Sequence, residues 1–195
     1  TATRGLTEKY GIDRVFNSPL AESSIIGTAM GMATLGYRPV VEIQFGDYIW
    51  YGMMQIRNEL ATLRYRSNGK WSCPFVIRVP VGGYIHGSLC HSQSIDGYFT
   101  HLPGIYIVYP SNASDAKGLL KTALRTDDPV LFLEHKSLLN ERGEVPEEEY
   151  FIPFGKASTC RRGTDLTVVA LTTMVRQVLD VGEKLAKDGL SIEVI

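Results

Sequence analysis

A glycine-rich loop carries the residues of this sequence that are best suited to chemistry. His86, Cys90 and His91 fall within residues 80–94, directly after a β-branched run at residues 75–79. In open parallel α/β sheets, ligands bind in the crevice at the carboxyl ends of the strands. The sequence therefore predicts a functional site at this loop.

Glu22 is a second candidate, at a distance from the loop in sequence. It follows a turn-forming stretch at residues 17–21 and begins a helical pattern, where the helix dipole favours a carboxylate. Its position alone favours this structural role over a catalytic one. Position alone also makes Asp47 a helix cap and Tyr48 a core aromatic residue.

Several kinds of site do not fit the loop. His86 and His91 lack the H-E-x-x-H and H-x-H spacings, so we predict no metal site in this chain. Cys90 and His91 are adjacent, and adjacent side chains of an extended segment point to opposite faces, which disfavours a thiol paired with that base. The G-x-G-x-x-G phosphate loop and the G-x-S-x-G nucleophile elbow are also absent from the sequence. Acid–base chemistry by a histidine and a distant glutamate remains.

The elements around these residues alternate between strand and helix patterns, which predicts an α/β fold with a parallel sheet flanked by helices. The predicted strands are residues 40–43, 75–79, 105–109 and 130–133. The predicted helices are residues 22–35, 49–63 and 114–125.

Two details of these helices concern packing. We expect Asp47 to cap the helix at residues 49–63. Gly27 and Gly31 interrupt the helix at residues 22–35, and each costs about 1 kcal/mol relative to alanine. We expect these glycines to allow a close helix contact, either within the fold or across a subunit interface.

An acidic, proline-containing stretch at residues 141–153 indicates a domain boundary. Residues 1–150 would form the first domain, and residues 151–195 a linker and the first β-α-β unit of a second domain. One such unit cannot cover both faces of its own sheet. The chain also begins without Met and ends in a strand-like run, so we expect a fragment of a longer protein.

Composition argues against several classes of partner. Lys and Arg number 20 against 21 Asp and Glu, for a net charge of -1, so neither nucleic acid nor a charged membrane surface is an expected partner. No apolar run reaches the roughly 18 residues of a membrane span. The 3 cysteines are widely spaced, which predicts free thiols in a reducing compartment.

Seven collinear segments extend over nearly the whole chain: PLAE (19–22), EIQFGDYI (42–49), QIRNE (55–59), LRYRS (63–67), HGSLCHSQ (86–93), LPG (102–104) and DAKGLL (115–120). Together they closely resemble the beta subunit of thiamine-diphosphate-dependent 2-oxo acid dehydrogenases. The branched-chain (2-oxoisovalerate) type is nearer than the pyruvate type, which usually lacks a histidine at the position of His86.

The resemblance implies a transketolase-like pyrimidine-binding domain with bound thiamine diphosphate. Glu22 would contact the ring nitrogen of the aminopyrimidine and favour its imino tautomer, and Tyr48 would pack on that ring. Gln44 would belong to the same cofactor site. His91 would pass protons during acyl transfer to a lipoyl group, and His86 is an additional candidate for the substrate pocket.

The resemblance also implies partners. The family's Gly-Asp-Gly motif for the diphosphate and Mg²⁺ is absent here and lies on the family's alpha subunit. An alpha subunit or fused alpha portion would therefore hold Mg²⁺, beside a second beta subunit and a lipoyl-bearing acyltransferase. A structural K⁺ near residues 126–127 follows by family analogy. The expected location is the cytoplasm of a bacterium, or the mitochondrial matrix in a eukaryote.

Three alternatives remain open from sequence. The first is an acetoin or pyruvate dehydrogenase beta subunit, and the second is another transketolase-like enzyme such as a deoxyxylulose-phosphate synthase fragment. The third belongs to a different class: a non-catalytic α/β module that uses its glycine-bearing helix for assembly.

Overall fold

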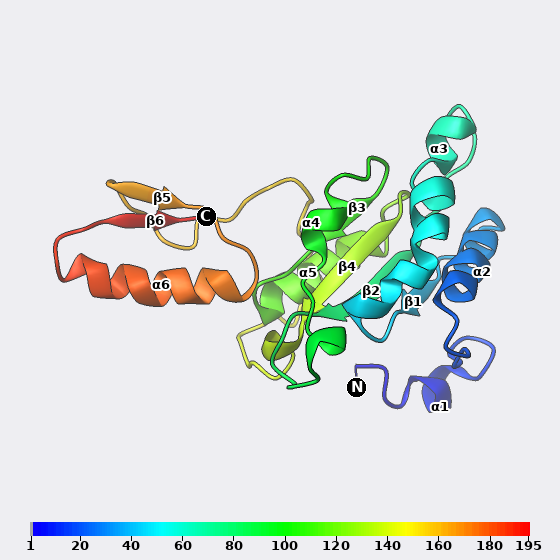
Figure 1. The fold of residues 1–195 in the computed structure, drawn as a ribbon, viewed down its shortest axis with the longest axis horizontal. Helices are drawn as coiled ribbons and strands as arrows, with labels where there is room; N and C mark the ends of the chain where they lie inside the picture. Colours follow the sequence, from blue (N-terminus) through cyan, green and yellow to red (C-terminus); the bar gives the residue numbers. More distant parts are fainter. Residues whose placement is uncertain (1) are drawn as a thin grey trace.

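Four parallel strands form the main sheet of the structure, a computed structural model that describes residues 2–195 (Figure 1). The strand order is β1-β2-β4-β3. The predicted strands are confirmed, and those at residues 75–79 and 130–133 extend further toward their carboxyl ends. The strands are β1 (Val40–Glu42), β2 (Val76–Val81), β3 (Tyr106–Val108) and β4 (Val130–His135).

The central strands β2 and β4 are buried on both faces, which explains their nearly continuous apolar sequences. Ile77 and Val79 belong to the larger hydrophobic cluster, and Val76 belongs to the smaller cluster on the opposite face. In the register of the sheet, Ile77 pairs with Leu131 and Val79 pairs with Leu133.

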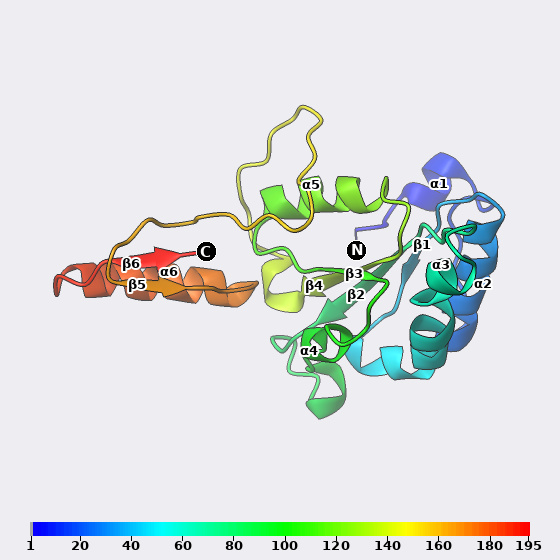
Figure 2. The ribbon, with the colours of Figure 1, turned by 90° about the horizontal axis from the view of Figure 1, so that it is seen from above.

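Helices cover both faces of this sheet. Figure 2 shows α5 (Ala113–Ala123) on one side and α2 (Glu22–Thr34) on the other, together with α3 (Leu63–Arg66) and α4 (Asp96–Phe99). A short helix α1 (Leu6–Tyr10) precedes α2 and buries no residue. The predicted fold class, a parallel α/β sheet flanked by helices, is confirmed.

The helix predicted at residues 49–63 is instead divided into three parts. A 3-10 helix η1 (Gly46–Gly52) is followed by a π-helix η2 (Gln55–Leu60) and then by α3. The predicted cap at Asp47 is wrong. A Cβ at Gly46 would lie 2.9 Å from Val81 Cγ1, so the chain starts its turn at this glycine against β2 and Asp47 falls inside the turn.

The close contact predicted for Gly27 and Gly31 within the fold is also wrong. Both lie on the exposed face of α2, where an added Cβ would meet no atom within 4 Å. Gly52 makes the close approach to α2 instead, because a Cβ there would lie 3.1 Å from Ile26 Cγ1 and 3.3 Å from the carbonyl oxygen of Glu22. The contact across a subunit interface stays a prediction.

Residues 141–153 form an arm along α5. Lys117 Nζ donates to the carbonyl oxygen of Glu148 at 3.0 Å, and the Thr122 hydroxyl donates to that of Ile152 at 2.7 Å. A Cβ at Gly118 would lie 2.7 Å from atoms of Tyr150 and Ile152. The small residue on α5 therefore lets the arm pack closely.

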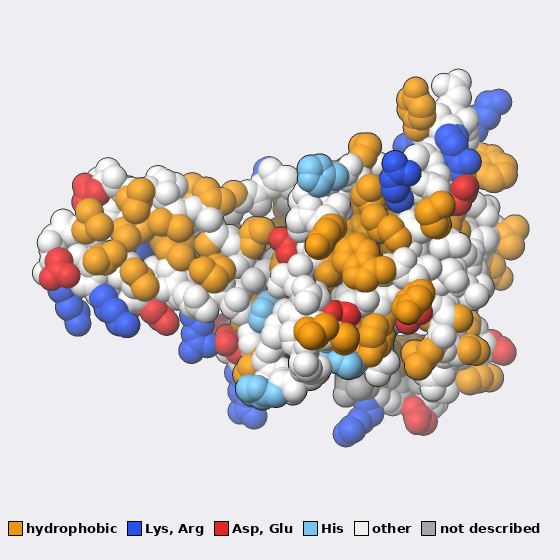
Figure 3. Space-filling view, viewed as in Figure 1, with side chains coloured by type: hydrophobic (Ala, Val, Ile, Leu, Met, Phe, Trp, Pro, Cys, Tyr) orange, Lys and Arg blue, Asp and Glu red, His pale blue; other side chains and the backbone are white. Residues whose placement is uncertain are grey.

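A second unit projects from the main sheet after this arm (Figure 1). It consists of β5 (Leu166–Val168), α6 (Thr173–Ala186) and β6 (Ile192–Val194), with β5 and β6 paired in parallel, as predicted. Hydrophobic side chains gather on its surface in Figure 3. Leu171 and Met174 are 58% and 50% exposed, which agrees with the expectation that this unit cannot cover its own faces. Among residues 2–195, no helix has both the length and the apolar character needed to cross a bilayer.

Candidate active site

The predicted site residues come from segments that meet at the carboxyl ends of three neighbouring strands. Phe45 and η1 follow β1, residues 82–94 follow β2, and η4 (Lys136–Leu138) follows β4. Backbone pairing fixes this convergence, since β1, β2 and β4 are adjacent and parallel. Open α/β sheets bind ligands at this carboxyl end of their strands.

A hydrogen bond connects Tyr48 and His91 directly at this end of the sheet. The Tyr48 hydroxyl lies 2.7 Å from His91 Nε2. His91 belongs to a short 3-10 helix, η3 (Leu89–His91), and its Nδ1 lies 2.9 Å from the carbonyl oxygen of Gly87. Both side chains are half-buried, so the pair is held by the protein and is still accessible.

Phe45 packs against both members of this pair, and sequence reasoning missed it. Its ring centroid lies 4.6 Å from that of His91 and 5.4 Å from that of Tyr48, in edge-to-face geometry each time. The backbone N–H of Tyr48 donates to the carbonyl oxygen of Phe45 at 3.0 Å, and this turn brings the two side chains together. The position directly after a strand was the signal that could have identified Phe45.

The loop that carries His91 has an unusual backbone. Tyr84, His86 and Ser88 have positive φ angles of 102°, 56° and 61°. Gly87 has no room for a side chain, since its Cβ would lie 2.6 Å from His91 Cβ. Such strained residues persist where surrounding contacts impose them, and they cluster at functional sites.

Lys136 is a buried cation at the same end of the sheet, and it too was missed from sequence. It is 5% exposed, and among the described residues its Nζ has no hydrogen-bond partner. The ammonium lies 5.4 Å from the centroid of the Phe45 ring. Burial lowers the pKa of Lys136, and the nearby Asp47 carboxylate opposes this change.

Glu22 is the first residue of α2 and is half-buried. Within residues 2–195 its carboxylate makes no hydrogen bond or ion pair, so it is available to a ligand. The contact between Gly52 and the Glu22 carbonyl places η1, and with it Tyr48, beside the first turn of α2. The elements that carry Glu22, Tyr48 and His91 are therefore neighbours.

Gln44 and His86 do not belong to the Tyr48–His91 pair, and both side chains are exposed. His135 lies at the end of β4, and its Nδ1 is 2.8 Å from the Ser137 hydroxyl. Burial, followed by the charge of Lys136, lowers the pKa of His135. His135 Nδ1 also accepts a hydrogen bond from the backbone N–H of Ser137, so this side chain caps the amino end of η4.

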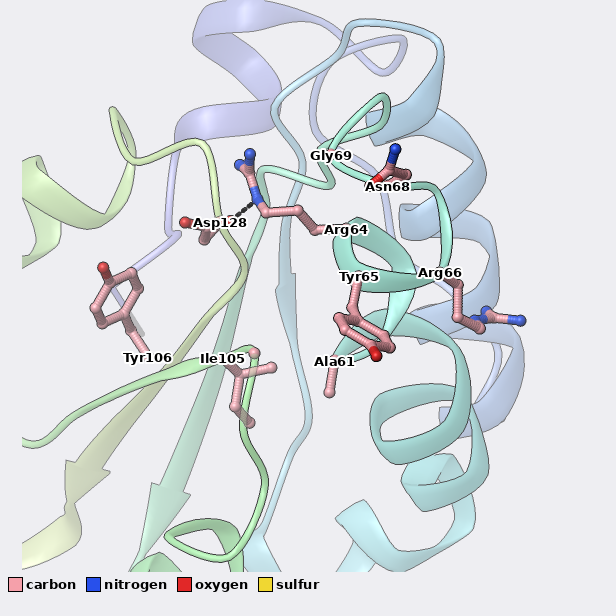
Figure 4. Close-up of a pocket in the computed structure, with 10 residues that line it drawn as sticks. Ala61, Arg64, Tyr65, Arg66, Asn68, Gly69, Ile105, Tyr106 and Asp128 are labelled. Carbon is pink, nitrogen blue, oxygen red and sulfur yellow. Dashed lines mark hydrogen bonds and ion pairs between the residues drawn. The ribbon is translucent and has the colours of Figure 1, made fainter.

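A cavity of about 860 Å³ lies at the opposite end of the sheet, near the start of β3 (Figure 4). Tyr106 and Asp128 line it from the amino ends of β3 and β4. Arg64 turns toward Asp128, with Nε 2.6 Å from the carboxylate, whereas Arg66 points away. This cavity lies at the amino ends of the strands, so it is a separate feature from the site that contains Tyr48 and His91.

Comparison with protein families identifies the domains. The model of the transketolase pyrimidine-binding domain matches residues 1–142, and that of the transketolase C-terminal domain matches residues 155–195. The chain belongs to the transketolase pyrimidine-binding domain family.

Curated relatives of this chain include proteins named as beta subunits of 2-oxo acid dehydrogenases. It is 50% identical over 195 residues to the 2-oxoisovalerate dehydrogenase subunit beta of Bacillus subtilis. It is 48% identical over 195 residues to the pyruvate dehydrogenase E1 component subunit beta of the same organism. Each match covers 100% of this chain and 60% of the relative, so the chain spans about three fifths of their length.

A solved structure confirms the transketolase-like fold. The chain superposes on a split gene transketolase, described as an inactive beta4 tetramer, with a TM-score of 0.80 and 22% identity. The match covers 99% of this chain and 60% of that one. At this identity the likeness concerns the fold alone.

Proposed function

We propose that this chain is the beta subunit, or beta portion, of a thiamine-diphosphate-dependent 2-oxo acid dehydrogenase. The carrying observation is the similarity, along the whole chain, to beta subunits that act in two such enzymes. The reaction is oxidative decarboxylation of a 2-oxo acid with transfer of the acyl group to a lipoyl domain. We take a branched-chain 2-oxo acid as the substrate, because His86 precedes His91 in the loop as in that type. Pyruvate is the second candidate, supported by the 48% identity.

The residues of this chain fit the pyrimidine half of thiamine diphosphate. Among the described residues the Glu22 carboxylate has no hydrogen-bond or ion-pair partner, and the aromatic ring of Tyr48 lies on the element packed beside it. When bound, the cofactor supplies the electron sink that decarboxylation of a 2-oxo acid requires. Gln44 lies on the same segment as Tyr48 and completes the proposed cofactor residues.

Each side chain has a separate task in this proposal. The Glu22 carboxyl group binds the ring nitrogen of the aminopyrimidine and sets its tautomer. The Tyr48 ring packs on the pyrimidine, which contributes about 0.5–1.5 kcal/mol beyond its burial. His91 handles protons during acyl transfer, as suits an imidazole, which can both accept and donate a proton. His86 reaches the substrate from the exposed loop.

The remaining requirements define the partners. The Gly-Asp-Gly motif is missing, so an alpha subunit or fused alpha portion holds the diphosphate and Mg²⁺. A second beta subunit and a lipoyl-bearing acyltransferase complete the assembly, in the cytoplasm of a bacterium. A structural K⁺ near residues 126–127 belongs to the same proposal. We place the domain boundary of this chain at about residue 150.

Reconstitution tests this function against the non-catalytic alternative. The complete beta subunit, the alpha partner and Mg²⁺ are mixed and titrated with thiamine diphosphate in a calorimeter, and saturable binding is expected only when both subunits are present. Turnover is then compared for 3-methyl-2-oxobutanoate, pyruvate and acetoin. Absence of cofactor binding would support an assembly module, and a preference for pyruvate or acetoin would replace the branched-chain substrate.

A further inference from the structure

Both ring nitrogens of His91 are already hydrogen-bonded within this chain. Nδ1 lies 2.9 Å from the carbonyl oxygen of Gly87, and Nε2 lies 2.7 Å from the Tyr48 hydroxyl. A carbonyl oxygen only accepts hydrogen bonds, so Nδ1 carries the proton of the neutral ring. Nε2 is then an acceptor, and the Tyr48 hydroxyl donates to it.

The hydrogen bonds therefore run in one direction, from the Tyr48 hydroxyl through His91 to the Gly87 carbonyl oxygen. Neither nitrogen of His91 has a free position, whereas a hydroxyl oxygen that donates one hydrogen bond keeps lone pairs for another. A reacting group thus reaches the His91 imidazole through the oxygen of Tyr48. The same tyrosine lies on η1, which packs beside the first turn of α2 where Glu22 begins.

We propose that Tyr48 and His91 form a proton relay in which the Tyr48 hydroxyl exchanges the proton with the reacting group. The inference rests on the proposed function, in which reacting hydroxyl and thiol groups occur. A reactant O–H or S–H gives its proton to Tyr48 Oη while the proton of Tyr48 moves to His91 Nε2. The reactant is left as an anion and His91 as an imidazolium cation, whose N–H groups donate to Gly87 and Tyr48.

The reverse sequence returns a proton to a leaving anion. His91 Nε2 gives its proton to Tyr48 Oη, while the proton that Tyr48 then carries passes to the thiolate formed when the lipoyl disulfide opens. The pair gains one proton in the forward transfer and loses one in the reverse transfer, and no electrons move, so the relay itself needs no oxidant or reductant. Tyr48 returns to its starting state after each transfer.

The surroundings hold this geometry in place. The Phe45 ring contacts both partners edge-on, which limits rotation of the imidazole and the phenol. The missing side chain at Gly87 lets its carbonyl lie against His91, because a Cβ would be 2.6 Å from His91 Cβ. The relay is thus fixed on both sides before any ligand binds.

Tyr48→Phe tests the relay, because it removes the hydroxyl and keeps the ring that packs on the cofactor. In the complete alpha–beta enzyme, we expect unchanged thiamine diphosphate affinity and a fall of about 10²-fold or more in the rate of lipoyl acylation. The rate is also measured against the deuterium fraction of the solvent. It is expected to curve in the wild type, where two protons move, and to become linear in the variant. Tyr150→Phe is the matched control, since Tyr150 is also half-buried and hydrogen-bonded, to Ser114 on α5.

A Tyr48→Phe enzyme that keeps the wild-type rate, or keeps the curved dependence, would overturn the relay. If this variant folds poorly, 3-fluorotyrosine at position 48 preserves the size of the ring and makes its hydroxyl more acidic. The relay then predicts a shifted pH–rate profile, and an unchanged profile would also overturn it. Failure of the wild-type enzyme to bind the cofactor is a different outcome, which removes the proposed function and the relay together.

Discussion

Arg78 and Glu134 form a two-pronged ion pair between β2 and β4. Arg78 Nε and Nη2 lie 2.8 Å from the two carboxylate oxygens, and Arg78 Nη1 lies 3.0 Å from Glu42 on β1. The side chains of Arg78 and Glu134 are 11% and 13% exposed, whereas that of Glu42 is 43% exposed. One guanidinium therefore joins the three strands whose carboxyl ends carry the candidate site.

Removing Arg78 alone should strongly destabilise the protein, because Glu134 would be left buried without its partner. We expect Arg78→Met to lower the free energy of unfolding by about 3–5 kcal/mol. Glu42→Gln should cost no more than about 1 kcal/mol, since that carboxylate is partly solvated. Urea unfolding measures both changes. The combined Arg78→Met, Glu134→Leu variant should recover most of the loss, and equal loss in the single and double variants would contradict this account.

Gly82 should not tolerate a side chain. It has a φ of 79°, and a Cβ would lie 2.2 Å from His135 Nε2. We expect Gly82→Ala to destabilise the protein by about 1–3 kcal/mol, measured by thermal or urea unfolding. Gly83→Ala is the matched control, because a Cβ at the neighbouring glycine meets no atom within 4 Å. Equal effects of the two substitutions would rule out this steric explanation.

His135 should make the protein sensitive to acid. Its pKa in the folded state is lowered from 6.5, mainly by burial, so the unfolded chain binds a proton more readily. The contribution of His135 to stability is therefore fully present above pH 6.5 and is lost as the pH falls through the lowered pKa. Unfolding free energies measured from pH 7 downward should fall less steeply in His135→Gln. The exposed His101 provides the control, because His101→Gln should leave the slope unchanged.

Glu22→Gln should separate cofactor activation from assembly. The amide cannot act as the carboxyl group does at the aminopyrimidine nitrogen, so exchange of the cofactor's thiazolium proton should slow by about 10²–10⁴-fold. Exchange into D₂O, followed by quenched NMR of the bound cofactor, measures this rate, and gel filtration checks the assembly. Exchange at the wild-type rate would exclude the proposed role. Glu183→Gln on α6 changes an exposed helical glutamate far from the site and serves as control.

His91→Ala should mainly impair acyl transfer. Without the imidazole, lipoyl acylation should slow by about 10²-fold or more, while decarboxylation measured with an artificial electron acceptor should change less. The ratio of these two rates is the quantity to compare. A parallel fall in both would show that His91 acts earlier in the reaction. The exposed histidine at position 86 offers the comparison His86→Ala, which should alter the substrate KM instead.

The parts of the fold that sequence predicted are those determined by local pattern. β2 and β4 are buried on both faces, so their sequences are apolar over almost their full length. The segment at residues 49–63 is likewise helical over most of its length, and it buries the apolar side chains of Ile49, Ile56 and Leu60. Its division into η1, η2 and α3 was not predictable. It depends on contacts of Gly46 with β2 and of Gly52 with α2, which no helical period encodes.

The same distinction applies to the candidate site. His91 and Glu22 stood out by residue type and position, and the family resemblance added Tyr48 and Gln44. Phe45 closely follows a predicted strand, which marks its position, but its contacts with His91 and Lys136 arise only when the segments that follow the strands come together. The roles given to Glu22, Tyr48, Gln44, His86 and His91 in catalysis stay predictions until the variants above are measured.

The loop with left-handed residues at positions 84, 86 and 88 has a consequence for how ligands bind. Each such conformation costs about 1–3 kcal/mol, and the hydrogen bonds of His91 offset part of this cost. For a ligand or subunit that recognises only this strained form of the loop, the apparent affinity is reduced in proportion to the fraction of molecules that hold it. Amide hydrogen exchange in this loop and ligand affinity should therefore change together, and substitutions that relax the backbone there would alter binding without touching the ligand.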